Sequence, residues 1–417
     1  MSAPDTHATI EAIWRIERAK IIAGLARMVR DVGRAEELAQ DALLAALQRW
    51  PGQGIPDNPA AWLMTAAKNR ALDELRRAKL IARKHEELGR EMDEADFPDL
   101  DAALDDDIGD DLLRLIFTAC HPVLATEARV ALTLRLIGGL TTEEIARAFL
   151  VPEPTVAQRI VRAKRALAEA RVPFEVPGGD ALAERLSSVL EVIYLIFNEG
   201  YSATKGDDWV RPALCEEALR LGRILAELAP DAPEVHGLAA LMEIQASRLA
   251  ARVGPNGEPV LLLEQNRARW DQLLIRRGLA ALTRAERLTE ERGPYVLQAA
   301  IAACHARART AGETDWARIA GLYDELAGRA PSPVVELNRA VAVAMAHGPA
   351  AGLELVDALT AEPTLKGYHL LPSVRGDFLK KLGRLDEARA EFERAAALTQ
   401  NARERKLLLD RAAALAS

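Results

Sequence analysis

Residues 141–165 read TTEEIARAFLVPEPTVAQRIVRAKR, and they carry the most specific structural pattern in the chain. Thr141 and Glu144 stand at the spacing of a capping box, which predicts a short helix over residues 142–149. Residues 150–153 are expected to form a turn, and Pro154 suits the first turn of a second helix, where proline's missing N–H is not needed. A short helix, a tight turn and a basic second helix are typical of a helix-turn-helix.

The second helix offers side chains that suit DNA. One face can be shared by residues at three- and four-residue intervals, namely Thr155, Gln158, Arg159 and Arg162. Glutamine and arginine hydrogen-bond to base edges, and arginine and lysine also bind phosphates. We expect Val156, Ile160 and Val161 to face inward. The alternative is a solvated basic helix on an ordinary bundle, which leaves the coincidence of cap, turn, proline and polar face unexplained.

The composition around this motif indicates an all-α protein. The chain has 417 residues, of which 78 are alanine, and its aromatic content is only 4%. Alanine is the best helix former, whereas strands favour β-branched and aromatic residues. The length predicts two or three domains, and a hydrophobic content of 49% excludes disorder of the chain as a whole.

The charge is segregated along the chain. A net charge of −8, if evenly spread, would argue against a nucleic-acid partner. Residues 1–90, however, hold 15 Lys and Arg against 12 Asp and Glu, and residues 112–173 hold nine against five. Residues 91–111 hold 11 acidic residues and no basic one, which predicts a flexible acidic linker. Residues 174–417 form a mildly acidic block, with 30 basic residues against 34 acidic ones.

The first basic unit carries a second pattern that suits nucleic acid. Residues 51–58 are rich in proline and glycine and predict a loop, after which Asn58-Pro59 opens a helix through about residue 84. Positive charge is concentrated along this helix and its end, at Lys68, Arg70, Arg76, Arg77, Lys79, Arg83 and Lys84. Such a helix can lie along phosphates, and Asn69 is short enough to bond an exposed base. Alone, a charged helix is more often a solvated face, so its pairing with a helix-turn-helix carries the argument.

These motifs resemble a bacterial RNA polymerase sigma factor of the extracytoplasmic-function class. In segment two of that family, tryptophan-leucine is followed by Asn, Asp and Arg-Arg at fixed intervals, and here these are Trp62-Leu63, Asn69, Asp73 and Arg76-Arg77. Segment four is matched by Glu144-Ile145-Ala146, Val151, Thr155-Val156, Arg159 and Arg162-Ala163. The resemblance covers roughly residues 10–172. Two departures, His121 for the usual leucine and Pro154 for the usual glycine, leave the promoter preference open.

The resemblance implies partners and roles. Core RNA polymerase would bind through the clamp helices of β′, which would face Glu37, Gln40 and Asp41, and through β. The promoter −10 element would meet the loop at residues 51–58 and the helix residues Lys68, Asn69, Arg70, Asp73, Arg76 and Arg77. The −35 element would meet Thr155, Gln158, Arg159, Arg162, Lys164 and Arg165 in the major groove.

The C-terminal block, residues 174–417, has no place in a minimal sigma factor. Tetratricopeptide packing positions are matched near its end by Gly376, Leu379, Gly383, Ala388, Phe392 and Ala395. The sequence therefore predicts a helical-repeat domain with a concave surface for a protein or peptide partner, and a plain helical bundle is the alternative. The layout resembles the subgroup of these sigma factors with a tetratricopeptide-like extension, which implies that the extension regulates the factor, either by occluding it or by being required.

The stretch Phe197-Asn198-Glu199-Gly200-Tyr201 resembles that subgroup's entry to the extension, and a packed turn that binds the extension to the second DNA unit is favoured there over a ligand site. The chain lacks a phosphate loop or a paired nucleophile and base, so we expect no enzyme activity and no cofactor. Cys120, Cys215 and Cys304 lack CxxC spacing, which predicts reduced thiols and no metal site.

The sequence has no signal peptide and no run of about 20 apolar residues, so a cytoplasmic protein without membrane contact is expected. Two alternatives to a sigma factor stay open. One is a conventional helix-turn-helix regulator with a repeat-type sensor, which would have no use for the motif at residues 62–77. The other is a repeat scaffold whose basic helices are incidental.

Overall fold

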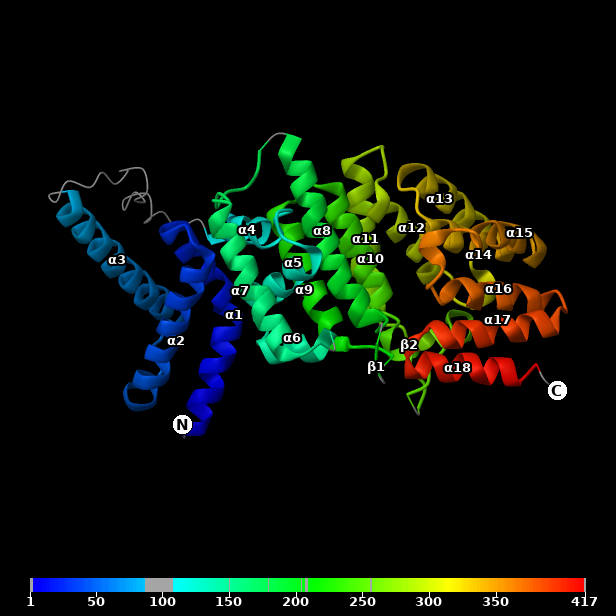
Figure 1. The fold of residues 1–417 in the computed structure, drawn as a ribbon, viewed down its shortest axis with the longest axis horizontal. Helices are drawn as coiled ribbons and strands as arrows, with labels where there is room; N and C mark the ends of the chain where they lie inside the picture. The colour runs from blue at the N-terminus through cyan, green and yellow to red at the C-terminus, as the bar shows by residue number, and fades with distance from the viewer. Residues whose placement is uncertain are drawn as a thin grey trace. The chain divides into compact units, whose positions relative to one another are not determined.

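The computed structural model describes residues 3–86, 108–149, 151–178, 180–203, 205–206, 209–255 and 257–415 (Figure 1). Within these ranges the secondary structure is almost entirely helical, as the alanine-rich composition predicted. The chain divides into two compact units, Met1–Val192 and Ile193–Ser417, and the division falls inside helix α8 (Asp180–Tyr201).

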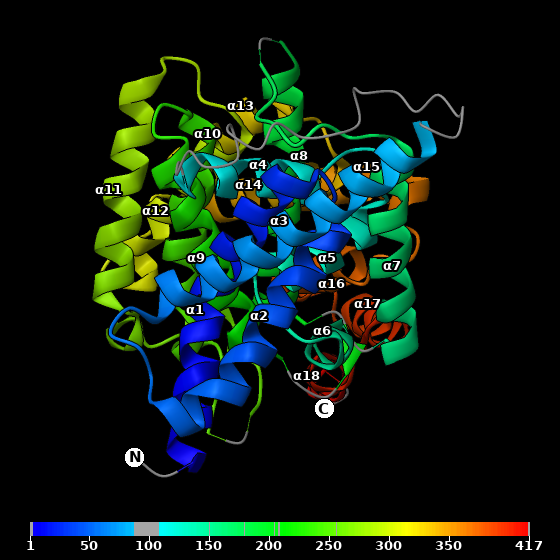
Figure 2. The same ribbon diagram turned by 90° about the vertical axis from the view of Figure 1, so that its left-hand side faces the viewer.

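The first unit contains two groups of helices. The first group comprises α1 (Ala3–Val29), α2 (Val32–Gln53) and α3 (Pro59–Glu86), which pack on one another (Figure 2). The second group comprises α4 (Ile108–Ala119), α5 (Thr126–Leu136), α6 (Thr142–Phe149) and α7 (Glu153–Glu169). The two groups touch, since α1 packs on α4 and α5, and α2 packs on α7.

The breaks in the first group have local causes. Arg30 adopts a left-handed conformation with φ 52°, which ends α1, and the Asp31 side chain then caps α2 by accepting from the backbone of Arg34 at 2.8 Å. The expected cap at Asn58 is confirmed, because its side chain accepts from the backbone N–H of Ala61 at 3.1 Å. The rings of Trp50 and Trp62 then meet edge to face, with centroids 5.3 Å apart, and join α2 to α3.

Two expected boundaries are wrong. The loop predicted over residues 51–58 begins later, because α2 continues through Pro51 to Gln53 before Gly54 ends it at φ 85°. The linker predicted over residues 91–111 ends earlier, because α4 already begins at Ile108. Asp111 is buried and paired with Arg27 and Arg114, so its charge does not exclude it from a packed helix. The rest of the predicted linker, through residue 107, lies outside the described residues.

The second unit is built from helices that pack mainly on their neighbours in the chain (Figure 1). After the end of α8 these are α9 (Pro212–Leu228), α10 (Pro233–Ala246), α11 (Gln272–Leu288), α12 (Pro294–Arg307), α13 (Trp316–Arg329), α14 (Pro333–His347), α15 (Pro349–Leu359), α16 (Leu370–Lys381), α17 (Leu385–Leu398) and α18 (Ala402–Ala413). Alanines fill the core of this unit, especially along α12, because close helix packing leaves room only for small side chains.

A short parallel strand pair joins the two ends of this unit. The strand β1 (Lys205–Gly206) pairs with β2 (Gln400–Asn401). The buried Asn401 strengthens the junction, since its Nδ2 donates to the carbonyl of Ala203 at 3.1 Å and its Oδ1 caps α18. The first segment of the unit is thereby tied to the last helix.

The stretch at residues 197–201 is packed, but it is the last turn of helix α8 and not a turn between elements, so the predicted turn is wrong. The Phe197 and Tyr201 rings stack with centroids 5.6 Å apart, and the Arg252 guanidinium lies 3.8 Å from the centre of the Tyr201 ring. Arg252 also donates to the carbonyl of Tyr201 at 3.0 Å.

Several negative findings hold for the described ranges. No helix among them is both long enough and apolar enough to span a bilayer. The described residues also contain no cluster of three or more His, Cys, Asp or Glu side chains suited to a metal. The three cysteines are free and buried, and burial raises the pKa of the Cys120 thiol to about 11.

Candidate nucleic-acid interface

The helix-turn-helix forms as the sequence predicts. Thr141 and Glu144 make a reciprocal capping box, since the Thr141 backbone N–H donates to Glu144 Oε2 at 2.7 Å and the Glu144 N–H donates to Thr141 Oγ1 at 3.1 Å. The helix that follows, α6, has the predicted bounds Thr142–Phe149. Pro154 lies in the first turn of α7, as expected. The turn predicted over residues 150–153 ends one residue earlier, because α7 already begins at Glu153, and Leu150 lies outside the described residues.

The second helix, α7, has one buried and one exposed side. Its buried side chains are Val156, Ile160, Ala163 and Leu167, at helical spacing. The inward position expected for Val161 is wrong, because its side chain is 64% exposed. It directly follows Ile160, and a step of 100° round the helix takes it off the packed side.

The residues predicted to meet the −35 element lie along α7 with unequal exposure. Gln158, Arg162 and Arg165 are exposed, at intervals of four and three residues, while Thr155 and Arg159 are half-buried. Arg165 also pairs with Glu169 one turn further on, at 2.6 Å. The remaining member, Lys164, is turned toward α2 instead of solvent.

The residues predicted to meet the −10 element lie on α3. Asn69, Asp73, Arg76 and Arg77 are exposed, and Lys68 and Arg70 are half-buried. Two of them make ion pairs, Arg70 with Asp41 at 3.2 Å and Arg76 with Asp73 at 3.7 Å. The side chains of Lys79, Arg83 and Lys84 lie outside the described residues.

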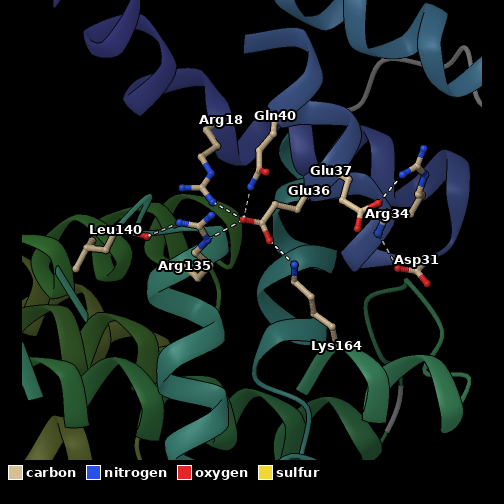
Figure 3. Close-up of polar contacts among 9 residues, drawn as sticks. All are labelled: Arg18, Asp31, Arg34, Glu36, Glu37, Gln40, Arg135, Leu140 and Lys164. Carbon is tan, nitrogen blue, oxygen red and sulfur yellow. Dashed lines mark hydrogen bonds and ion pairs between the residues drawn. The ribbon is translucent and has the colours of Figure 1, made fainter. Parts of the chain in front are cut away.

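The residues predicted to bind the polymerase lie on α2. Glu37 is exposed and pairs with Arg34 (Figure 3). Asp41 is half-exposed and pairs with Arg70 of α3. Gln40 is half-buried, and its Nε2 donates to Glu36 Oε1 at 3.1 Å. Of the three, Glu37 is therefore the most accessible.

Glu36 is a residue of this region that the sequence interpretation passed over. Its carboxylate is buried and lies among three cations, Arg18 of α1, Arg135 of α5 and Lys164 of α7 (Figure 3). Burial alone would raise the pKa of Glu36, but the charges of Lys164, Arg135 and Arg18 outweigh it and hold that pKa below its ordinary value. The available signal was the helical spacing of α2, which sets Glu36 among the buried positions.

Comparisons with known proteins bear on this geometry. The family model for sigma-70 region 2 matches residues 15–81, and the model for sigma-70 region 4 matches residues 114–167. Residues 185–286 match a family of unknown function, DUF6596. The first match covers most of the α1–α3 group, and the second covers the helix-turn-helix.

Three relatives show how far the likeness extends. An uncharacterized protein of Rhizobium meliloti (strain 1021) is 45% identical over 388 residues, which are 93% of this chain and 91% of that protein. The probable ECF RNA polymerase sigma factor SigI of Mycobacterium tuberculosis (strain ATCC 25618 / H37Rv) is 30% identical over 41% of this chain, and the match spans 58% of SigI. The ECF RNA polymerase sigma factor SigL of the same strain is 31% identical over 39% of this chain and 83% of SigL.

The chain belongs to the ECF RNA polymerase sigma factors, with sigma-70 regions 2 and 4 followed by a helical domain of unknown function. It is a transcription initiation factor that directs RNA polymerase to promoters, and it has no enzyme activity of its own. The alternatives of a conventional regulator and a repeat scaffold are thereby excluded.

Proposed function

We propose that promoter recognition is divided between α3, which meets the −10 element, and α7, which meets the −35 element. The supporting observation is that both helices carry basic and amide side chains on exposed positions, Asn69, Arg76 and Arg77 on the first and Gln158, Arg162 and Arg165 on the second. Accordingly, residues 1–90 and 108–173 act as the two DNA-binding domains, and the acidic segment at residues 91–107 joins them.

The major-groove role falls to α7. Val156, Ile160 and Ala163 anchor its inner side, which fixes the direction of the outer side chains. A recognition helix of this kind enters the major groove with its N-terminal half, where arginine can bind the O6 and N7 atoms of guanine with two hydrogen bonds. Gln158 and Arg162 are the exposed residues best placed for base contacts, while Arg165 suits a phosphate.

Replacement of Arg162 by alanine tests this role. We expect the binding free energy of the polymerase holoenzyme for its promoter to weaken by about 1–3 kcal/mol, because one bidentate base contact contributes that much. The measurement compares binding to the cognate −35 sequence and to a scrambled one, and Arg287→Ala, an exposed arginine of α11, is the charge-matched control. A base contact predicts a loss confined to the cognate sequence, and an unchanged affinity would refute it.

Polymerase binding falls to α2 in this proposal. Glu37 and Asp41 supply exposed negative charge one turn apart, and Gln40 lies between them. We assign these residues to the clamp helices of the β′ subunit, with β as a further contact. Acidic side chains at a polymerase contact would pair with basic side chains on the polymerase.

The C-terminal domain is proposed to be a tetratricopeptide-like repeat that modulates the sigma factor through a protein or peptide partner. Support comes from α16 and α17, where Leu379, Ala388, Phe392 and Ala395 are fully buried, as such a repeat requires. Gly383 lies in the turn between the two helices with φ 77°, a conformation that favours glycine. The neighbour-on-neighbour packing of the unit agrees with a solenoid.

A further inference from the structure

The buried carboxylate of Glu36 ties the two sigma regions together. Its Oε1 accepts from Arg18 Nη2 at 2.8 Å and from Arg135 Nε at 2.8 Å, and its Oε2 is 2.5 Å from Lys164 Nζ (Figure 3). Arg18 and Glu36 itself belong to the region 2 helices α1 and α2. Arg135 and Lys164 belong to the region 4 helices α5 and α7. One side chain thus bridges parts of the chain about a hundred residues apart.

In the cluster formed by Glu36, Arg18, Arg135 and Lys164, Glu36 carries the one negative charge. The Glu36 side chain is only 3% exposed, and those of Arg18, Arg135 and Lys164 are 6%, 21% and 23% exposed. A single negative charge therefore holds three cations that repel one another. Burial and the nearby charge of Arg135 lower the pKa of Arg18 to about 10, so Arg18 is still charged near neutral pH. Without the carboxylate, these cations would be driven apart and into water.

The contact engages residues that other partners are proposed to use. Lys164 is one of the side chains assigned to the −35 element, and here its amine is bound to Glu36. Gln40, assigned to the polymerase, donates to the same carboxylate. The Lys164 amine therefore has to turn away from Glu36 before it can reach a DNA phosphate. A polymerase contact at Gln40 would remove one hydrogen bond from the same carboxylate and weaken the cluster.

The interface beside the cluster is not close-packed. A cavity of about 710 Å³ opens between α1, α2, α4 and α7, and Lys164 and Arg171 line it together with Arg27, Arg30 and Asp31. An interface with such a space gains less from apolar contact there, so a larger share of its stability falls to the ion pairs. This arrangement suits a contact that opens and closes.

We propose that Glu36 is a latch that holds region 2 and region 4 in a closed state in the free sigma factor, with Lys164 withheld from DNA until polymerase engages α2 and releases it. The proposal rests on the roles proposed above for Lys164 and Gln40. It gives the free protein a means to avoid promoter DNA when no polymerase is present. The latch lies wholly within the first unit.

The distance between the two regions in the free, full-length protein tests the latch. Spin labels on Leu44→Cys in α2 and Val161→Cys in α7 report it, since both positions are more than half exposed. The three native cysteines are buried, so labelling is selective for the new thiols. Glu36→Gln removes the charge with little change in volume. Glu17→Gln is the matched control, because Glu17 pairs with Lys20 inside α1.

We expect a single short distance in the unsubstituted pair and in Glu17→Gln, and a broad, longer distribution in Glu36→Gln. Lys164→Gln guards against misfolding, since it removes one of the two region 4 partners of Glu36 and leaves the carboxylate bonded to Arg18 and Arg135. It should also lengthen the distance, to a smaller extent. If a folded Glu36→Gln protein, or Lys164→Gln where Glu36→Gln does not fold, keeps the short distance, the latch is refuted.

Binding of −35 DNA without polymerase supplies a second readout. Glu36→Gln should bind several-fold more tightly than the unsubstituted protein, because Lys164 is released. The double variant Glu36→Gln/Lys164→Gln should lose that gain. A double variant that keeps the gain would overturn the withholding of Lys164. Neither result depends on the polymerase, so failure of the latch is distinct from failure of the proposed polymerase and promoter roles, which are tested with the holoenzyme.

Discussion

At the scale of single residues, the molecule keeps several ionisable side chains away from water. Glu36 and Asp111 remain tied to cations, Glu36 to Arg18, Arg135 and Lys164, and Asp111 to Arg27 and Arg114. His305 is different, because its surroundings favour the neutral imidazole. Burial and the nearby charges of Arg248 and Arg267 lower the pKa of His305 to about 4. Its ring packs edge to face on Trp316, with centroids 5.1 Å apart.

The lowered pKa of His305 predicts a pH-dependent stability. Between pH 6.5 and about 4 the unfolded chain takes up a proton at this position and the folded chain does not. Stability should therefore fall as the pH falls through this range, by up to about 1.4 kcal/mol per pH unit, and His305 should have no such effect above pH 7. Chemical unfolding at several pH values measures this slope.

His305→Phe should reduce that slope, since phenylalanine keeps the contact with Trp316 and does not titrate. His347→Phe, an exposed histidine at the end of α14, is the matched control. If His305→Phe leaves the slope between pH 6.5 and 4 unchanged, His305 is not buried as the neutral form.

Sequence reasoning reached some residues of the site and not others. The three- and four-residue spacing of side chains shows which positions share one face of a helix. Gln158 and Arg162 were therefore predicted to lie on the same face of α7, and both are exposed. Glu36 was missed because charge normally marks an outward position. Its burial depends on Arg135 and Lys164, which stand about 100 and 128 positions away in the chain, and no local pattern reports such partners.

At the scale of helices, two glycines differ in whether a neighbouring helix leaves room for a larger side chain. A Cβ atom on Gly376 of α16 would lie 2.9 Å from the ring of Phe392 and 3.2 Å from the carbonyl oxygen of Ala388, both on α17. A Cβ on Gly321 of α13 would meet nothing within 4 Å. The same substitution should therefore have opposite effects at the two positions.

Gly376→Ala should destabilise the C-terminal domain by about 1–3 kcal/mol, because it overpacks the contact with the fully buried Phe392. Gly321→Ala should be neutral or stabilising by up to about 1 kcal/mol, because alanine favours the helix. Unfolding midpoints of the full chain measure both effects. A Gly376→Ala protein as stable as Gly321→Ala would contradict the close approach of α16 and α17.

Helices that begin with local signals were the best predicted. The capping box at Thr141 and the cap at Asn58 involve atoms three residues apart, so the sequence alone specifies them. Boundaries set by distant contacts were not predicted. The early start of α4 is one example, because Asp111 is accommodated there by Arg27 of α1. The run of acidic residues gave no sign of that partner.

At the scale of the whole molecule, two units share one chain, and the role proposed for the second is to modulate the first. The Gly376→Ala protein serves to test this proposal as well, because it weakens the second unit without touching the sigma regions. Its promoter-specific transcription, per molecule bound to polymerase, should differ from that of Gly321→Ala. A rise would assign an inhibitory role to the C-terminal domain, and a fall would assign a required one. Equal activity at a temperature where the C-terminal domain of Gly376→Ala is unfolded and that of Gly321→Ala is folded would contradict modulation.

The most direct test of the central claim is promoter-specific transcription by core RNA polymerase supplied with the full-length chain. We predict that the chain co-elutes with the core enzyme and that transcripts start at a defined site on a cognate promoter. The same start should be lost when Asn69, Arg76 and Arg77 on α3 are replaced together by alanine, while co-elution persists because the proposed polymerase contacts lie on α2. A chain that neither co-elutes with core polymerase nor yields a defined transcript would contradict the account.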